Sequence, residues 1–177
     1  MSSKIGLFKS HGDGRPSIDS FKKYGTNVVM EPSVMVFHPE NIELNDNLYI
    51  GHQTILKGYY NNLMSIGPNT WIGQQSFLHS AGGLTIGANV GIGIGVKIIT
   101  SLHTEEGTDL PIIASKISFA PVQIADDCDI GVGAIILPGV SIGRGVQVGA
   151  GAVVTHSLES FVVAAGVPAR VLRYRDQ

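Results

Sequence analysis

Apolar residues recur at six-residue intervals along most of the chain. Isoleucine or valine fills every sixth position in two unbroken runs, from Ile86 to Ile98 and from Ile124 to Val154. A second small or medium apolar residue follows each of them after four residues, so the two side chains face the same way on an extended strand. Each hexad therefore predicts one short strand and one turn, and a fixed short period of this kind is typical of a repeat architecture.

Glycine indicates how the hexads are arranged in space. Gly131 and Gly149 directly follow an apolar position and lie 18 residues apart, while Leu137 and Thr155 take the equivalent place on another face with the same separation. Three hexads thus make one coil of a triangular prism, with glycine at tight corners that other residues resist. The pattern predicts an all-β fold, a parallel β-helix whose coils bury their apolar edges against one another.

Interruptions of the period divide the chain. An N-terminal segment opens it, and its Ser17 and Gly25 are a plausible N-cap and stop that predict a short helix between them. The interval from Ile98 to Ile124 holds about twenty residues more than one hexad needs, which predicts an extruded loop. The expected parts are an N-terminal segment and cap over 1–41, a β-helix domain over 42–163 with the loop at about 104–121, and a basic tail over 164–177.

Two histidines lie beside the predicted loop. His103 precedes it and follows Leu102, which the hexad pattern places inward, so alternation turns His103 outward at the mouth of the loop. A long insertion in a compact fold is usually functional, so the sequence places a histidine on the outer surface at the mouth of a loop that is expected to have a function. His79 follows inward-facing Leu78 in the preceding coil and is likewise expected to point outward.

Composition narrows the possible partners. The net charge is −2 and the isoelectric point is about 6.3, so no broad nucleic-acid or membrane footprint is expected. The single cysteine, Cys128, falls at an inward position and is expected to be a core side chain. No apolar run approaches the roughly 20 residues of a membrane span, and the start lacks a secretory apolar region. We therefore expect a cytoplasmic protein.

The order of these segments resembles one family. The residues that carry the likeness are SLHT at 101–104, PVQIADDCDIGVGAIILPGVSIGRG at 121–145, VGAGAVVT at 148–155 and AAGVPARVLR at 164–173. They are similar to the hexapeptide-repeat acyltransferases, and most of all to the sugar O- and N-acetyltransferases around galactoside and maltose acetyltransferase. The likeness is strong over about 86–173 and extends more weakly back to about residue 42.

The resemblance implies more than the periodicity does. It implies a left-handed β-helix, a homotrimer with active sites between neighbouring prisms, and acetyl-CoA as the donor without a required metal. It also implies that His103 is the general base, a role that suits imidazole because it titrates near neutrality. Which neighbouring carboxylate or carbonyl orients His103 is left open among Glu105, Glu106, Asp109 and the backbone. His79, in the coil before His103, is the candidate for contact with the acceptor, and a role of His79 as the base itself also stays open.

The resemblance also suggests where the donor binds. Positions that match the family's coenzyme A contacts are Gly131, Val132, Ala150, Thr155, Arg170 and Arg173. Small residues let a pantetheine arm lie close to the coils, and arginines bind phosphates through charge-assisted hydrogen bonds. The sequence departs from the family at Asp129, where many relatives have tryptophan, and at 77–83 (FLHSAGG), which lacks the acidic and amide contacts of galactoside enzymes.

The leading hypothesis is therefore an acetyl-CoA-dependent acetyltransferase that acts on a sugar or a nucleotide-linked sugar, in surface polysaccharide or O-antigen synthesis. O-transfer and N-transfer both remain open, as do serine-type and antibiotic acceptors. One alternative is a non-enzymatic scaffold. Another is a γ-type carbonic anhydrase, which needs three converging histidines with two of them close in sequence; the six histidines here contain no such pair.

Overall fold

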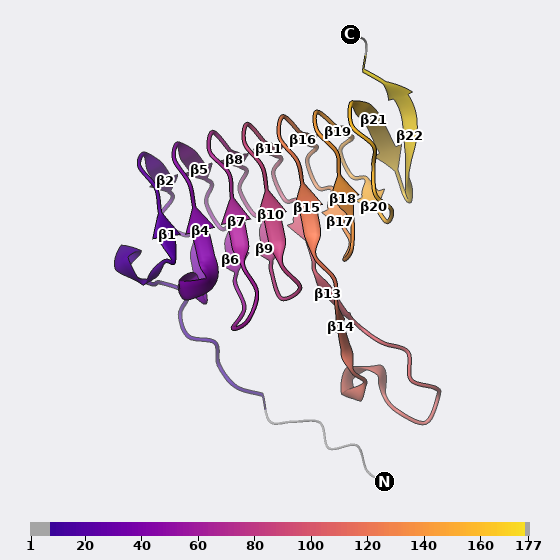
Figure 1. Ribbon diagram of the computed structural model, residues 1–177. Coiled ribbons are helices and arrows are strands. Elements are labelled where there is room, and N and C mark those ends of the chain that lie inside the picture. Colours follow the sequence, from indigo (N-terminus) through magenta and orange to yellow (C-terminus); the bar gives the residue numbers. More distant parts are fainter. Residues whose placement is uncertain (1–7, 176–177) are drawn as a thin grey trace.

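The computed structural model describes residues 8–175, and these residues form a triangular prism of stacked coils (Figure 1). Three sheets make its faces. Sheet A contains β1 (Lys23–Tyr24), β4 (Ile42–Leu44), β7 (Met64–Ile66), β10 (Leu84–Ile86), β15 (Val122–Ile124) and β18 (Ser141–Ile142). Sheet B contains β2 (Val28–Met30), β5 (Leu48–Ile50), β8 (Trp71–Ile72), β11 (Gly91–Ile92), β16 (Asp129–Ile130), β19 (Gln147–Val148), β21 (Val162–Gly166) and β22 (Ala169–Tyr174). Sheet C contains β3 (Met35–Phe37), β6 (Ile55–Lys57), β9 (Phe77–His79), β12 (Lys97–Ile98), β17 (Ile135–Ile136) and β20 (Val153–Val154).

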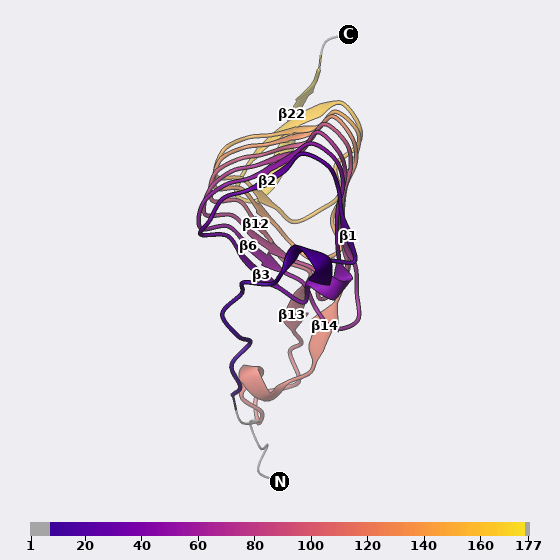
Figure 2. The same cartoon turned by 90° about the vertical axis from the view of Figure 1, so that its left-hand side faces the viewer.

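The coil is left-handed. Figure 2 looks along the prism from its N-terminal end, and the chain turns anticlockwise from β1 through β2 to β3 as it recedes from the viewer. All strand pairs within the prism are parallel except the last, β21 with β22. The structure thus confirms the left-handed parallel β-helix.

Like side chains stack from coil to coil in the core. On sheet B, Ile92 pairs in register with Ile72 on one side and Ile130 on the other, and all three are fully buried. Each such side chain contributes about 1.5–3 kcal/mol by leaving water. Cys128, two residues before Ile130, is also buried, as predicted, and burial raises the pKa of its thiol.

Polar side chains stack in the same way at the corner between sheets A and B. The amide of Asn47 donates to Asn69 Oδ1 over 2.9 Å, that of Asn69 donates to Asn89 over 3.1 Å, and that of Asn89 donates to Asp127 over 3.0 Å. Each of these residues has a positive φ, a backbone conformation that asparagine and aspartate tolerate better than most residues. Arg144 ends the series by donating from Nε to Asp127 Oδ2 over 2.7 Å. The ladder therefore holds the turns of successive coils in line.

The expected N-terminal helix is not formed. Only a single 3-10 turn, η1 (Ile18–Ser20), occurs there, and the chain then enters β1, where Tyr24 pairs with Leu44. A helix this short gains little because its first turn is costly to nucleate, whereas β1 adds a strand to sheet A. Gly25 serves coil stacking instead of ending a helix, because a Cβ there would lie 2.5 Å from the Asn45 carbonyl carbon.

Excursions from the prism gather at the corner between sheets C and A. The 3-10 turn η2 (Pro39–Asn41), the segment 58–63 and the long insertion all leave there (Figure 1). The insertion is an antiparallel hairpin of β13 (Ser101–His103) and β14 (Ile117–Phe119) with η3 (Ile112–Ala114) between them. Leu102 is 53% exposed, so its predicted inward placement is wrong. The chain has already left the coil at Ser101, and the hairpin has no core beneath it.

The C-terminal segment closes the other end of the prism. β22 folds back on β21 and extends the edge of sheet B. The Tyr174 hydroxyl donates to Glu159 over 2.9 Å, and Arg175 Nη1 donates to the Gly145 carbonyl over 2.8 Å. Residues 176–177 of the predicted tail, like 1–7 of the N-terminal segment, lie outside the described residues.

Candidate active site

One row of outward side chains follows the corner between sheets C and A, and we call it the site row. Strand register places Lys57 beside His79. Ile98 pairs with Leu78, so the next residue, Ile99, lies beside His79. In the same way Leu137 lies beside Ile99, and Thr155 lies beside Leu137. Each step between coils is about 4.8 Å. The row is therefore a continuous strip along which one ligand can contact several coils.

His103 stands next to this row on the hairpin. The hairpin leaves the prism directly after Ile99 and Thr100, so His103 lies about 10 Å along the extended strand from Thr100. Its ring is exposed, and its Nδ1 lies 3.3 Å from the Ser115 carbonyl oxygen, which is a hydrogen-bond acceptor only. When Nδ1 donates to that carbonyl, Nε2 is left as a proton acceptor directed away from the hairpin backbone.

A backbone carbonyl therefore holds His103, and none of the three carboxylates considered from the sequence does so. The Glu106 carboxylate instead accepts hydrogen bonds from the Thr104 hydroxyl and the Lys116 backbone N–H. The Ser115 carbonyl was not distinguishable in the sequence, because hairpin pairing sets its position, with His103 opposite Ile117.

His79 lies at the base of the hairpin. Its Nδ1 is 3.4 Å from Thr100 Oγ1, and that hydroxyl donates to the His79 carbonyl over 3.0 Å. Its ring stacks on Phe77 with centroids 6.0 Å apart and meets Tyr59 edge-on at 6.2 Å. Burial, and after it the charge of Lys57, lower the pKa of His79, so the imidazole is neutral near pH 7.

Tyr59 joins the hairpin to the prism. Its ring centroid lies 6.2 Å from that of Phe119, the residue opposite Ser101 at the hairpin base. Opposite residues of an antiparallel pair share a face, and so do residues two apart on one strand. His103 and Phe119 consequently project from the same face of the hairpin, on the side of Tyr59. No motif in the sequence marks Tyr59 or Phe119, although the interruption of the six-residue period at 58–62 (GYYNN) indicates that the segment with Tyr59 departs from the coil.

The predicted donor positions border sheet C on two sides. Gly131 and Ala150 adjoin at the corner between sheets B and C, where a Cβ on Gly131 would lie 2.6 Å from the Ala150 nitrogen. Val132 is 54% exposed beside them. Thr155 lies at the opposite corner, at the C-terminal end of the site row. The outer face between the corners carries half-buried Ile135 and Val153, an apolar surface suited to a pantetheine chain.

The two arginines lie on β22, with different surroundings. Arg170 is opposite Ala165, and Arg170 lines a hollow of about 380 Å³ together with His156 and Ser157. Arg173 is opposite Val163, farther along the strand. Both side chains are exposed and donate only to backbone carbonyls nearby, which leaves further donors of each guanidinium available.

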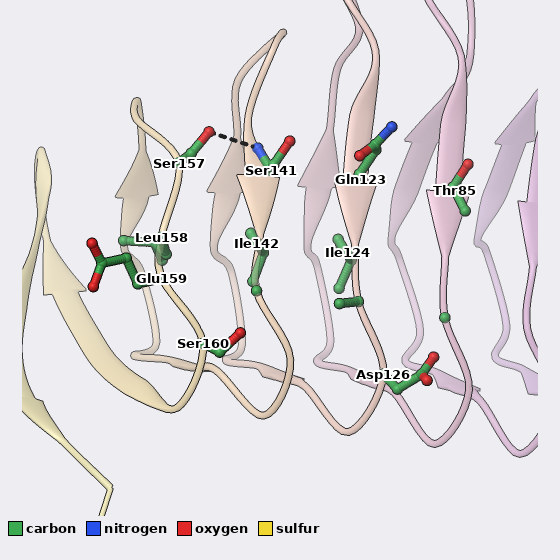
Figure 3. A pocket seen from close by; sticks show the side chains of 13 residues that line it. Thr85, Gln123, Ile124, Asp126, Ser141, Ile142, Ser157, Leu158, Glu159 and Ser160 are labelled. Atoms are coloured by element: carbon green, nitrogen blue, oxygen red, sulfur yellow. Dashed lines mark hydrogen bonds between the residues drawn. The ribbon is translucent and has the colours of Figure 1, made fainter.

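A larger hollow of about 630 Å³ lies on the outer face of sheet A and contains none of the predicted site residues (Figure 3). Thr85, Gln123 and Ser141 project into it from successive coils, and the Ser157 hydroxyl accepts from the Ser141 backbone N–H over 3.0 Å. The lining of this hollow contains no histidine and no residue of the hairpin, whereas the site row contains His79 and adjoins the point where the hairpin leaves the prism.

Comparison with known proteins agrees with this architecture. The family described as "Hexapeptide repeat of succinyl-transferase" matches residues 121–156. WcaF of Escherichia coli, which carries the name of a colanic acid biosynthesis acetyltransferase, is 31% identical over 153 residues, 86% of this chain and 69% of WcaF. A Schizosaccharomyces pombe protein named as an acetyltransferase is 43% identical over 91 residues, 51% of this chain and 42% of that protein.

Solved structures share the prism. AntD, an N-acyltransferase from Bacillus cereus solved with dTDP and coenzyme A, superposes with a TM-score of 0.80 at 25% identity, covering 89% of this chain and 86% of AntD. VCA0836, a hexapeptide-repeat acetyltransferase from Vibrio cholerae solved with acetyl coenzyme A, has a TM-score of 0.67 at 24% identity, covering 90% and 74%. The fold and these relatives identify a β-helix acyltransferase. The chain belongs to the hexapeptide-repeat acetyltransferase family.

Two absences apply to the described part of the chain. Between residues 8 and 175, no helix is long and apolar enough to cross a membrane. Over the same residues, no three histidine, cysteine, aspartate or glutamate side chains gather as a metal site.

Proposed function

We propose that the protein transfers an acetyl group from acetyl-CoA to a hydroxyl or amine of a sugar or nucleotide-linked sugar, in surface polysaccharide synthesis in the cytoplasm. The observation that carries the proposal is that His79 and Thr155 lie along one corner of the prism and that the hairpin carrying His103 leaves the prism at this same corner. Names of relatives support it, since WcaF is assigned to colanic acid biosynthesis. AntD has been solved with dTDP-4-amino-4,6-dideoxyglucose and coenzyme A.

His103 acts as the general base in this mechanism. With Nδ1–H donating to Ser115, Nε2 accepts the proton of the acceptor hydroxyl or amine as that atom attacks the acetyl carbonyl carbon. The C–S bond of the thioester then breaks, and His103 returns the proton to the leaving sulfur, so the imidazole is neutral at the end of each cycle. A positioned base of this kind contributes about 10²–10⁴-fold to the rate.

The donor lies across sheet C in this proposal. Gly131, Val132 and Ala150 border the pantetheine arm at one corner, and Thr155 borders it at the other. Arg170 and Arg173 bind the adenosine phosphates at the C-terminal end, where the guanidinium donors are exposed. The reactive thioester then lies at the site row, within reach of the hairpin.

A homotrimer completes the site. His103 is exposed in the single chain, and the hairpin presents apolar side chains to solvent, among them Ile112 at 60% exposure and Ile113 at 56%. Apolar surface of this kind is typical of an interface. We propose that the hairpin packs against a neighbouring prism and encloses the site. Sedimentation is expected to give about three times the chain mass of 18.7 kDa.

Calorimetric titration of acetyl-CoA, followed by thiol release in the presence of amino sugars, hexosides and nucleotide sugars, tests the proposal. Wild type is expected to bind, and His103→Ala to bind equally well while turnover falls about 10²–10⁴-fold. His52→Ala, an exposed histidine paired with Glu31 at another corner, is the matched control and retains activity. Failure of the wild type to bind at saturating acetyl-CoA would refute the acetyltransferase.

A further inference from the structure

Lys57 is a partly buried cation that forms no ion pair with any carboxylate in the part of the chain that the structure describes. It ends β6 on sheet C, and its Nζ lies 4.2 Å from the centroid of the Phe37 ring. Other basic groups in residues 8–175 form five ion pairs with carboxylates, and none of these includes Lys57. Lys57 is half-buried, and this burial lowers the pKa of its ammonium group.

The neighbours of Lys57 are aromatic and not acidic. His79 is its partner in register on β9, and Tyr59 contacts the His79 ring. The acidic residue on the adjoining turn, Glu40, already binds His38 Nδ1 over 2.8 Å. A partly desolvated charge with no counterion is costly to maintain, and an anion that binds beside Lys57 compensates it.

The position of Lys57 relates it to the reaction. It lies two coils from Ile99, beside which the hairpin with His103 leaves the prism, and two coil steps are about 10 Å. The Tyr59 ring contacts both His79 and Phe119, so aromatic surface against which a sugar can pack links the row to the base of the hairpin. A sugar with its reacting group at His103 and a charged substituent directed along the site row brings that substituent to Lys57.

We infer that Lys57, between its register neighbours Phe37 and His79 and near the Tyr59 ring that contacts His79, forms a subsite for an anionic substituent of the acceptor, either the carboxylate of an acidic sugar or the diphosphate of a nucleotide-linked sugar. The inference rests on the proposed function for the identity of the site, but its chemistry depends only on a lysine among aromatic side chains that forms no ion pair within residues 8–175. Phe37 holds the lysine side chain in place by a cation–π contact, and Tyr59 and Phe119 provide the surface for the sugar ring.

Binding to the full chain tests the subsite, with dTDP and glucuronate as anionic probes and glucose as the neutral one. Wild type is expected to bind at least one anionic probe, and Lys57→Met is expected to weaken that binding about tenfold or more, the loss typical of a charge-assisted hydrogen bond. Lys57→Arg retains most of the affinity. Loss confined to dTDP assigns the subsite to a diphosphate, and loss confined to glucuronate assigns it to a carboxylate.

The control is Lys97→Met, which changes an exposed lysine on the same face of sheet C that donates to the Gly95 carbonyl. It is expected to leave probe affinity unchanged. Titration of the His79 ring by NMR gives a second readout: a bound anion offsets the charge of Lys57 and raises the pKa of His79 in wild type, and this rise is absent in Lys57→Met.

The outcomes separate this inference from the proposed function. If acetyl-CoA binds but neither anionic probe does, the subsite inference is wrong and the proposed acetyltransferase activity stands. The same conclusion follows if Lys57→Met and Lys97→Met weaken probe binding equally. If a probe binds in a manner that depends on Lys57 while acetyl-CoA does not bind, the anion subsite stands and the acetyltransferase is wrong.

Discussion

Ile98 and Ile99 are neighbours with opposite surroundings, and their substitution by alanine is expected to have opposite consequences. Ile98 is fully buried, paired in register with Leu78 and Ile136. Ile99 is partly exposed on the site row, between His79 and Leu137. The same chemical change at adjacent positions therefore tests which side of the prism wall each side chain occupies.

The magnitudes follow from burial. Ile98→Ala removes three carbon atoms from the core, which loses about 2–3 kcal/mol of transfer free energy. The cavity left between Leu78 and Ile136 raises the cost to about 3–4 kcal/mol. For a chain of this size each kcal/mol lowers Tm by about 2–4 °C, so Tm is expected to fall roughly 6–16 °C. Ile99→Ala loses only partial burial and is expected to cost about 1 kcal/mol or less.

Activity is expected to change in the reverse order. Ile99 supports the strip between His79 and the base of the hairpin, so its truncation lets acceptor and base move apart. Misplacement by about 1 Å can reduce rate by about 10²-fold, and we expect Ile99→Ala to lower turnover at least about tenfold while far-UV circular dichroism shows nearly unchanged unfolding. Ile98→Ala, assayed well below its Tm, is expected to retain more activity than Ile99→Ala.

A result in which Ile99→Ala destabilises as much as Ile98→Ala would refute the assignment of Ile99 to the outer row. Equal turnover of Ile99→Ala and wild type would show that the row does not support the reaction. Lys97→Ala on the same strand is the control for alanine itself, because Lys97 is exposed and is expected to change neither property.

Three further predictions follow from the same geometry. Substituting both Arg170 and Arg173 by alanine is expected to weaken acetyl-CoA about tenfold or more by calorimetry and to reduce the salt dependence of binding, whereas Arg144→Ala, which removes a guanidinium engaged with Asp127, leaves affinity unchanged. The folded-state pKa of His79 is below its ordinary value of 6.5. Between these two pKa values the unfolded chain binds more protons than the folded chain, so stability falls as the pH drops below about 6.5. Tm measured from neutral to acidic pH is expected to fall less steeply in His79→Gln than in wild type, and parallel curves would contradict the lowered pKa of His79. Gly131→Ala is expected to lower both Tm and acetyl-CoA affinity, since its Cβ would lie 2.6 Å from backbone atoms of the next coil, while Ala150→Ser, at an exposed position beside it, keeps Tm unchanged.

The six-residue period alone determined the prism and its core. It marks Ile92, Ile130 and Val148 as inward residues of one face, because each coil repeats the same geometry and burial depends only on position within the hexad. The broken period between Ile98 and Ile124 likewise predicted an excursion. The hand of the coil came from the family resemblance, since the hexad pattern is the same for both hands.

Only the tertiary structure decided what lies beside what at the corner between sheets C and A. Segments of unequal length separate Lys57, His79 and Ile99 in the chain. Strand register alone therefore places these three residues in one row. The Ser115 carbonyl reaches His103 because β13 and β14 pair with each other, a pairing that no hexad pattern contains. Where the structure repeats, position in the sequence is enough to assign a side chain; where the chain departs from the repeat, long-range pairing sets the neighbours, and this is where the candidate site lies.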